Sequence, residues 1–502
     1  MMAASPTALS GPSRPLALHP ENPHYFLFRG RPTVLITSGE HYGAVLNLEF
    51  DYAKYLDTLA KDGLNLTRTF SGAYAEPYGA FNITSNTLAP APDRFICPWA
   101  RSETPGYANG GNKFDLTKWD EGYFRRLKDF VTRAGKRGIV VEMNLFCPMY
   151  EESQWRLSPQ NAGNNVNGVG DVARTNIYTL DKNGGLLAAQ EALVRKIVTE
   201  LHGFDNVYYE ICNEPYFGGV TREWQHHIAD VIVETERGLL GERPKGPTPD
   251  PSREGNTTSS RSRMLPSSGE IGGGFEPAAG FHLISQNIAN KEAKVENPHA
   301  AVSIFNFHYA SPPDTVTMNY GLNKVIGDNE TGFRGTNDLP YRVEAWEFIL
   351  AGGGLFNHLD YSFTARHEDG TFVYPAKQPG GGNPAFRRQM KVLKDYIDGF
   401  DFLRMKPLPS VVTNKAFAGV TSRVLGEPGR AYAVYLAPGG EKTTPREAVI
   451  ALELPPGSYR AEWVNPVSGK IDKRETVKSE KGFVVLTSPP YREDIALKLI
   501  RK

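Results

Sequence analysis

The chain has 502 residues, and its 56 Lys and Arg residues balance its 56 Asp and Glu residues, so the formal net charge is zero. A balanced chain without a basic run argues against nucleic acid and anionic membranes as partners, because both are recognised through positive charge. With 40% hydrophobic and 22% charged residues, the composition is typical of a globular protein with a large core.

No membrane span is predicted, since the longest apolar stretch, 348–356, contains three consecutive glycines. The first twenty residues lack the apolar segment of about 7–15 residues that a signal peptide has. We therefore expect a cytoplasmic protein, or a secreted or periplasmic one whose signal peptide was removed. The three cysteines (Cys97, Cys147 and Cys212) are too scattered for a zinc site or a disulfide framework, and we expect them to be free and buried.

From about residue 33, short apolar runs alternate with amphipathic helical stretches, a pattern typical of parallel strands covered by helices. Strands are predicted at 34–38, 65–70, 139–146, 206–213, 282–286, 302–309, 324–328 and 355–361. Helices are predicted from about Asp51, from about Lys118 to Gly138, over 187–201 and over 341–350. Eight strand and helix repeats indicate an α/β fold, a closed (β/α)8 TIM barrel.

Three regions are expected: an N-terminal extension (1–32), the barrel (33–406) and a C-terminal part (407–502). Within the barrel, 243–274 is rich in Pro, Ser and Gly and is not expected to pack. It follows a helix and precedes a strand, which predicts a place on the N-terminal face, away from the catalytic loops. Beyond 407, short alternating runs predict a small antiparallel β-sandwich. We expect it to brace the barrel; its aromatic residues Tyr459, Trp463 and Tyr491 leave glycan binding as the alternative.

Two glutamates end predicted barrel strands, Glu214 within Asn213-Glu214-Pro215 after the fourth and Glu330 in the seventh. The C-terminal ends of barrel strands face the active site. Glycoside hydrolysis needs two such carboxyl groups, one to protonate the leaving oxygen and one to act at the anomeric carbon. Each glutamate alone could cap a strand or pair with an arginine, but their joint placement favours catalysis.

On these motifs the sequence resembles the clan A retaining glycoside hydrolases, in particular cellulase-like barrels with a C-terminal β-sandwich, over roughly 20–502. The resemblance implies a retaining glycosidase that hydrolyses a β-linked or equivalent O-glycosidic bond of an oligosaccharide or glycoside by double displacement. It implies Glu214 as the acid/base and Glu330 as the nucleophile. Asn213 would bind the sugar 2-OH, and Arg68 would lie against the nucleophile.

The end of the sixth strand departs from the clan, which usually separates its His and Tyr by one residue, whereas His308 and Tyr309 are adjacent. Since successive strand side chains point to opposite faces, only one of the two is expected to face the site. His308 has the inward parity, and a buried core histidine is its alternative role. Further candidates for contacts with sugar hydroxyls are His41, Asn144 and Asp360.

Loop aromatics at Trp99, Trp155 and Tyr74 could stack on a pyranose or merely anchor their loops. Repulsion between the two carboxyl groups is expected to raise the pKa of Glu214. The adjacent pair His226-His227 diverges by about 100° on a helix and cannot share a metal. We expect no metal, nucleotide or redox cofactor.

The alternative function is a non-catalytic carbohydrate-binding barrel that has lost turnover. Binding alone does not require the set Glu214, Glu330, Asn213 and Arg68, which argues against this alternative.

Overall fold

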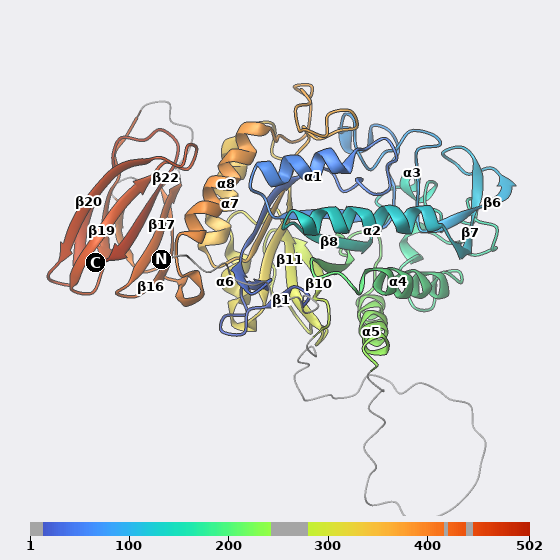
Figure 1. Ribbon diagram of the computed structural model, residues 1–502, viewed down its shortest axis with the longest axis horizontal. Coiled ribbons are helices and arrows are strands. Elements are labelled where there is room, and N and C mark those ends of the chain that lie inside the picture. The colour runs from blue at the N-terminus through green and yellow to red at the C-terminus, as the bar shows by residue number, and fades with distance from the viewer. Residues whose placement is uncertain (1–13, 242–279, 416–419, 438–444) are drawn as a thin grey trace, which may run out of the picture.

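The computed structural model describes residues 14–241, 280–415, 420–437 and 445–502. Eight parallel strands form one sheet in the order β4-β13-β12-β11-β10-β9-β8-β5 (Figure 1). Its end strands β4 and β5 also pack against each other, so the sheet curves into a nearly closed barrel. The predicted TIM barrel is confirmed, with strands β4 (Leu35–Gly39), β5 (Leu66–Phe70), β8 (Val140–Phe146), β9 (Val207–Cys212), β10 (Ile284–Asn290), β11 (Val302–His308), β12 (Val325–Thr331) and β13 (Leu355–Leu359).

Helices cover the outside of the barrel, which is why nearly every strand residue is buried on both faces. They are α1 (Tyr52–Lys61), α2 (Glu121–Lys136), α3 (Glu152–Trp155), α4 (Leu187–Leu201), α5 (Arg222–Leu239), α6 (Asp314–Asn319), α7 (Asp338–Leu350) and α8 (Pro384–Asp398). Short 3-10 turns occur at Ala80–Asn82, Arg174–Asn176, Tyr320–Leu322 and Phe402–Arg404.

The second predicted helix begins later than expected. The Asp120 carboxylate accepts hydrogen bonds from the backbone N–H groups of Gly122 and Tyr123, which fixes the start of α2 at Glu121. Trp119, expected inside this helix, instead ends β7 (Asn112–Trp119), which pairs with β6 (Trp99–Pro105) in a hairpin of the long loop after β5.

The N-terminal residues close the lower end of the barrel. Strands β1 (Ala17–Leu18), β2 (Phe26–Phe28) and β3 (Arg31–Thr33) form a small antiparallel sheet. Leu16, Phe26 and Phe28 from this segment share a core with the first residues of the barrel strands. The interior is therefore plugged at this end, and a ligand must enter from the C-terminal ends of the strands.

The predicted β-sandwich is also confirmed. A six-stranded sheet, β14-β16-β17-β22-β19-β20, faces a three-stranded sheet, β15-β18-β21. Tyr459 and Trp463 are fully buried and Tyr491 is nearly so, and all three belong to the sandwich core. The strands are β14 (Lys406–Pro407), β15 (Val412–Lys415), β16 (Thr421–Glu427), β17 (Ala431–Ala437), β18 (Val449–Glu453), β19 (Gly457–Val464), β20 (Ile471–Ser479), β21 (Phe483–Thr487) and β22 (Ile495–Arg501).

One face of the six-stranded sheet belongs to the hydrophobic core of the barrel, whereas the interior of the sandwich forms a separate core, and in Figure 1 the sandwich lies beside α7 and α8. Trp346 of α7 stacks on Tyr435 of β17 at a centroid distance of 5.2 Å. Beside this stack, Nε of the buried Arg342 lies 2.8 Å from Oδ2 of Asp494, and the Tyr396 hydroxyl donates to the Leu497 carbonyl at 2.7 Å. The sandwich therefore braces the outer helices of the barrel.

Three further predictions concern the cysteines, membrane spans and the segment 243–274. Cys97, Cys147 and Cys212 are free and buried, as expected. Within the described ranges, no helix has the length and apolar character needed to cross a membrane. The segment 243–274 falls within 242–279, outside the described residues.

Candidate active site

A cavity of about 260 Å³ lies at the C-terminal ends of the barrel strands, and both predicted glutamates line it. Glu214 follows β9 and Glu330 lies in β12, and their residues are 7% and 6% exposed. Loops after several other strands complete the wall. The remaining lining residues are His41, Tyr42, Phe70, Tyr74, Glu76, Phe81, Leu88, Cys147, Tyr150, Asn213, Phe217, Asn290, Tyr309 and Phe333.

The Glu330 carboxylate is held by three donors, from β5 and from the segments that follow β4 and β11. The Tyr309 hydroxyl donates to Oε1 at 2.8 Å, and the Tyr42 hydroxyl donates to Oε2 at 3.1 Å. Nη1 of Arg68 also donates to Oε2, at 3.3 Å. These contacts fix one carboxylate edge against the wall of the cavity.

The Glu214 carboxylate has a different set of partners. Nδ1 of His308 lies 3.0 Å from Oε1, the Tyr150 hydroxyl donates to Oε2 at 2.6 Å, and the Tyr216 hydroxyl donates to Oε1 at 3.2 Å. Burial raises the pKa of Glu214, but the hydrogen bond and charge of His308 and the two hydroxyls outweigh it, so the pKa lies below its ordinary value. The expectation of a raised pKa for Glu214 is therefore wrong. The sequence alone does not show that these residues, some of them distant in the chain, contact the carboxylate.

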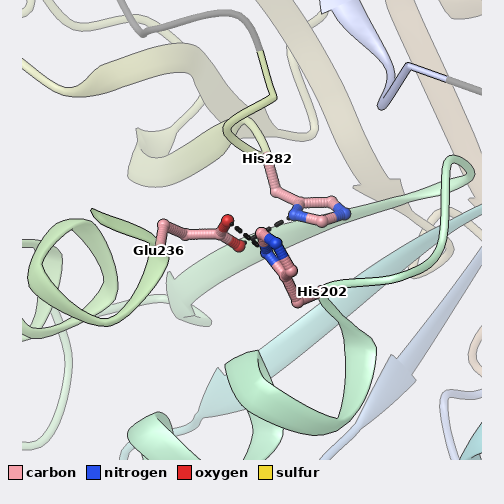
Figure 2. Close-up of side chains that lie close together, drawn as sticks. All are labelled: His202, Glu236 and His282. Atoms are coloured by element: carbon pink, nitrogen blue, oxygen red, sulfur yellow. Dashed lines mark hydrogen bonds and ion pairs between the residues drawn. The ribbon is translucent and has the colours of Figure 1, made fainter. Parts of the chain in front are cut away.

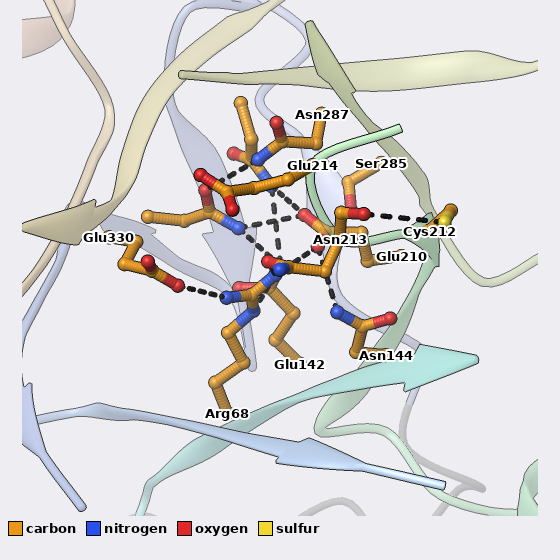
Figure 3. Close-up of polar contacts among 12 residues, drawn as sticks. Arg68, Glu142, Asn144, Glu210, Cys212, Asn213, Glu214, Ser285, Asn287 and Glu330 are labelled. Carbon is orange, nitrogen blue, oxygen red and sulfur yellow. Dashed lines mark hydrogen bonds and ion pairs between the residues drawn. The ribbon is translucent and has the colours of Figure 1, made fainter. Parts of the chain in front are cut away.

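Arg68 lies beneath both glutamates and connects them (Figure 3). Besides Glu330, it donates to Oδ1 of Asn213 through Nη2 at 2.8 Å. Nδ2 of Asn213 in turn donates to the Tyr150 hydroxyl at 2.8 Å, and that hydroxyl donates to Glu214. A single buried cation thus orients the nucleophile candidate directly and the acid/base candidate through two intermediates.

Two further carboxyl groups surround Arg68 in the barrel interior. Glu210 of β9 forms a very short contact with Nη2, and Oε1 of Glu142 lies 3.4 Å from Nε. Burial raises the pKa of Glu210, but the charge of Arg68 and hydrogen bonds lower it overall. Burial and the neighbouring Glu210 raise the pKa of Glu142 well above its ordinary value. The pKa values of these two neighbouring carboxyl groups are therefore shifted in opposite directions beside Arg68.

Both His308 and Tyr309 reach the glutamates, so the expectation that only one would face the site is wrong. His308 ends β11, and Tyr309 lies just beyond the strand with a φ of 55°. This left-handed backbone conformation breaks the strand alternation and turns the Tyr309 side chain to the same side. His308 contacts Glu214, and Tyr309 contacts Glu330.

The three remaining site residues predicted from the sequence lie at different positions relative to the cavity. His41 lines the cavity, with Nε2 3.7 Å from Oε1 of Glu76. Asn144 lies beneath the cavity and donates to Glu210 at 3.1 Å. Asp360 does not line the cavity; its carboxylate pairs with Arg387 of α8 at 2.7 Å. It follows β13 with the parity of His358, which also packs against this outer helix layer.

Sequence reasoning missed several groups around the glutamates. Tyr150 and Tyr216 lie in loops, where no periodicity reveals their direction. Glu210 had a detectable signal, because a glutamate inside an otherwise apolar strand is unusual. Trp99 and Trp155 are buried loop anchors, and among the three predicted loop aromatics Tyr74 lines the cavity.

Within the described residues, two groups of three side chains have nitrogen or oxygen atoms that could bind a metal ion, and in each group these atoms lie within 4.8 Å of one another. One is Glu214, His308 and Glu330, and the other is His202, Glu236 and His282 (Figure 2).

In the second group, Nδ1 of each histidine lies 2.8 Å from an oxygen of the buried Glu236. Nε2 of His282 lies 2.7 Å from the Phe204 carbonyl. These are hydrogen-bond lengths, shorter than the ligand separations of about 3.3 Å in a tetrahedral zinc site. We therefore interpret the cluster as a hydrogen-bonded link between the end of α4, α5 and the residues just before β10.

Comparison with known proteins finds similarity at the level of the fold. No protein-family model and no curated protein matches the sequence. Among solved structures, a glycoside hydrolase of family 5 from Bacteroides vulgatus is 13% identical, with a TM-score of 0.59 over 97% of this chain and 93% of that one. A structure described as a glycoside hydrolase is also 13% identical, with a TM-score of 0.60 over 97% of each chain. The complete two-part architecture is thus that of solved glycoside hydrolases.

Proposed function

We propose that this chain is a retaining glycosidase in which Glu330 is the nucleophile and Glu214 the acid/base. The observation that carries the proposal is the placement of the two glutamates at the ends of β9 and β12, with one oxygen of each within 4.8 Å of the other. Retaining enzymes separate their carboxyl groups by about 5–5.5 Å, and inverting enzymes by about 6.5–9.5 Å. The short separation favours the retaining mechanism.

In the first step, Glu330 attacks the anomeric carbon while the bond to the leaving oxygen breaks, and Glu214 gives its proton to that oxygen. The product is a glycosyl ester of Glu330. In the second step, Glu214 removes a proton from water, whose oxygen attacks the anomeric carbon and releases Glu330. One residue thus serves first as acid and then as base.

The surrounding residues suit these roles. Arg68 and two tyrosine hydroxyls orient the carboxylate of Glu330 toward the substrate. Glu214 must carry a proton when the leaving group departs, and its pKa lies below its ordinary value. We therefore expect the working range of the enzyme to lie on the acidic side of neutral pH.

The same chemistry, together with a fold like that of a family 5 glycoside hydrolase, supports a proposal for the substrate class. We assign a β-linked or equivalent O-glycoside, either a small glycoside or an oligosaccharide. A carbohydrate-binding barrel without turnover would use the cavity but would leave the glycosidic bond intact.

A covalent trapping experiment tests the proposal. Activated 2-deoxy-2-fluoro glycosides of several sugars are incubated with the protein, and peptides are analysed by mass spectrometry. We expect a glycosyl adduct on the peptide containing Glu330, and none on the Glu330→Gln chain. An adduct on another residue, or a product of inverted configuration, would contradict the assignment.

A further inference from the structure

The mouth of the cavity carries three partly exposed phenylalanines, Phe81, Phe217 and Phe333, which we call the aromatic rim. Their exposed fractions are 39%, 43% and 38%, and all three line the cavity. They come from the loops that follow β5, β9 and β12, so three separate segments bring the same side chain to one place. Large apolar side chains left open to water at a concave site indicate a binding surface.

Tyr150 links the aromatic rim to the acid/base candidate. Its ring contacts Phe81 at a centroid distance of 5.5 Å and Phe217 at 5.8 Å. Its hydroxyl donates to Glu214 at 2.6 Å. Phe81 also faces Phe333 at 6.4 Å. The apolar wall of the cavity is therefore continuous with the side on which Glu214 acts.

Part of the cavity wall is polar. His41 and Glu76 lie there, and the buried Nδ1 of His41 has no hydrogen-bond partner among the described residues. His41 contacts the ring of Tyr42, whose hydroxyl binds Glu330. An unsatisfied polar nitrogen beside the nucleophile candidate suits the hydroxyl groups of a sugar ring. Two of the rim residues, Phe81 and Phe217, therefore lie on the Glu214 side through Tyr150, whereas Phe333 contacts the ring of Tyr309 on the Glu330 side at 6.2 Å.

We propose that the bond cleaved by this chain joins a sugar to an apolar alkyl or aryl leaving group, which lies against the aromatic rim. The inference rests on the proposed function, because the group beside the acid/base is the one that departs. A second sugar in this place could stack its apolar face on one ring, but its hydroxyl groups would lose water, and phenylalanine rings offer no hydrogen bond in exchange. A cavity of about 260 Å³ is small and suits one sugar ring more than a chain of them.

Methyl and octyl β-glycosides test the proposal, because their leaving alcohols have nearly the same acidity and differ in apolar surface. Both are assayed for glucose, galactose, mannose and xylose, together with β-linked disaccharides and 4-nitrophenyl glycosides. For the accepted sugar, we expect kcat/KM for the octyl glycoside to exceed that for the methyl glycoside and the disaccharide at least tenfold. In F81A, F217A and F333A, the ratio of octyl to methyl kcat/KM should fall severalfold.

Tyr78→Ala is the matched control, because Tyr78 belongs to the same loop as Phe81, is 91% exposed and does not line the cavity. Its octyl to methyl ratio should equal that of the parent chain. Hydrolysis of 4-nitrophenyl glycosides with no preference for octyl would overturn this proposal and leave the glycosidase assignment standing. A preference for disaccharides, or a ratio unaffected by all three rim variants, would also overturn it. No hydrolysis of any glycoside would overturn both.

Discussion

The surroundings of Glu330 and Glu214 differ in one decisive respect. Each carboxylate accepts three hydrogen bonds, and in each case two come from tyrosine hydroxyls. The third donor is Arg68 for Glu330 and His308 for Glu214. Arginine carries a permanent positive charge, whereas Nδ1 of an imidazole can act as donor or acceptor. Nδ1 of His308 also lies 3.6 Å from Oε1 of Glu330, so both carboxylates have this histidine as a neighbour and only Glu330 contacts the permanent charge of Arg68.

The largest expected effect on activity comes from removing the carboxylate of Glu330, the nucleophile candidate. Glu330→Gln keeps the shape of the side chain but cannot form the glycosyl ester. We expect kcat to fall on the order of 10⁵–10⁶-fold, as for the loss of a nucleophile in other hydrolases. Initial rates on 4-nitrophenyl glycosides measure this, with Glu234→Gln, a 61% exposed glutamate side chain on α5, as the control. A loss below about tenfold would refute the role of Glu330.

Removing the other carboxyl group should have an effect that depends on the leaving group. Glu214→Ala is expected to lower kcat/KM by about 10²–10⁴-fold for alkyl glycosides, because their oxygen must be protonated as it leaves. For 2,4-dinitrophenyl glycosides the loss should be much smaller, since that group departs as an anion. A plot of log kcat/KM against leaving-group pKa measures the difference. Equal losses across the series would indicate a structural role.

The contribution of the permanent charge of Arg68 can be tested by measuring the free energy of unfolding. Arg68→Met leaves Glu210 buried without its ion-pair partner, and we expect the free energy of unfolding to fall by about 3–5 kcal/mol at neutral pH. The folded pKa of Glu210 is lowered, so its stabilising contribution is present above its unfolded pKa of about 4.3 and is lost as the pH falls below that value. The difference between the two chains should therefore shrink in acid.

Urea unfolding at several pH values measures the Arg68→Met effect. The surface pair of Arg137 and Asp57 supplies the control, and Arg137→Met should cost at most about 1 kcal/mol. A pH-independent loss in Arg68→Met would show that packing, and not the charge of Arg68, is responsible.

The smallest expected effect concerns His308, the histidine beside Glu214. The His308→Ala substitution removes the hydrogen bond and the charge interaction that lower the pKa of Glu214, while burial still raises it. We expect the basic limb of the kcat/KM profile to move upward by about one pH unit. His226→Ala, on α5 and outside the cavity, should leave the profile unchanged. A downward shift in His308→Ala would contradict the assigned cause.

The sequence predicted the barrel well because a parallel strand buried on both faces is an uninterrupted apolar run. Glu214 and Glu330 were detectable because each charged residue follows or ends such a run. The rest depends on contacts between distant segments. Tyr309 reaches Glu330 through a backbone conformation that breaks strand alternation, and Tyr150 reaches Glu214 from a loop. The pKa of Glu214 follows from these contacts, so the prediction made from two like charges failed.

The stacked pair Trp346 and Tyr435 has a consequence for the evolution and engineering of this chain. Because one face of the six-stranded sheet packs into the core of the barrel, the sandwich is not a detachable module, even though its interior forms a core of its own. A truncated barrel would expose an apolar face and the charged Arg342 that now pairs with Asp494. The two parts should unfold in a single cooperative transition. Grafting either part onto another protein would require replacing this shared surface as a unit.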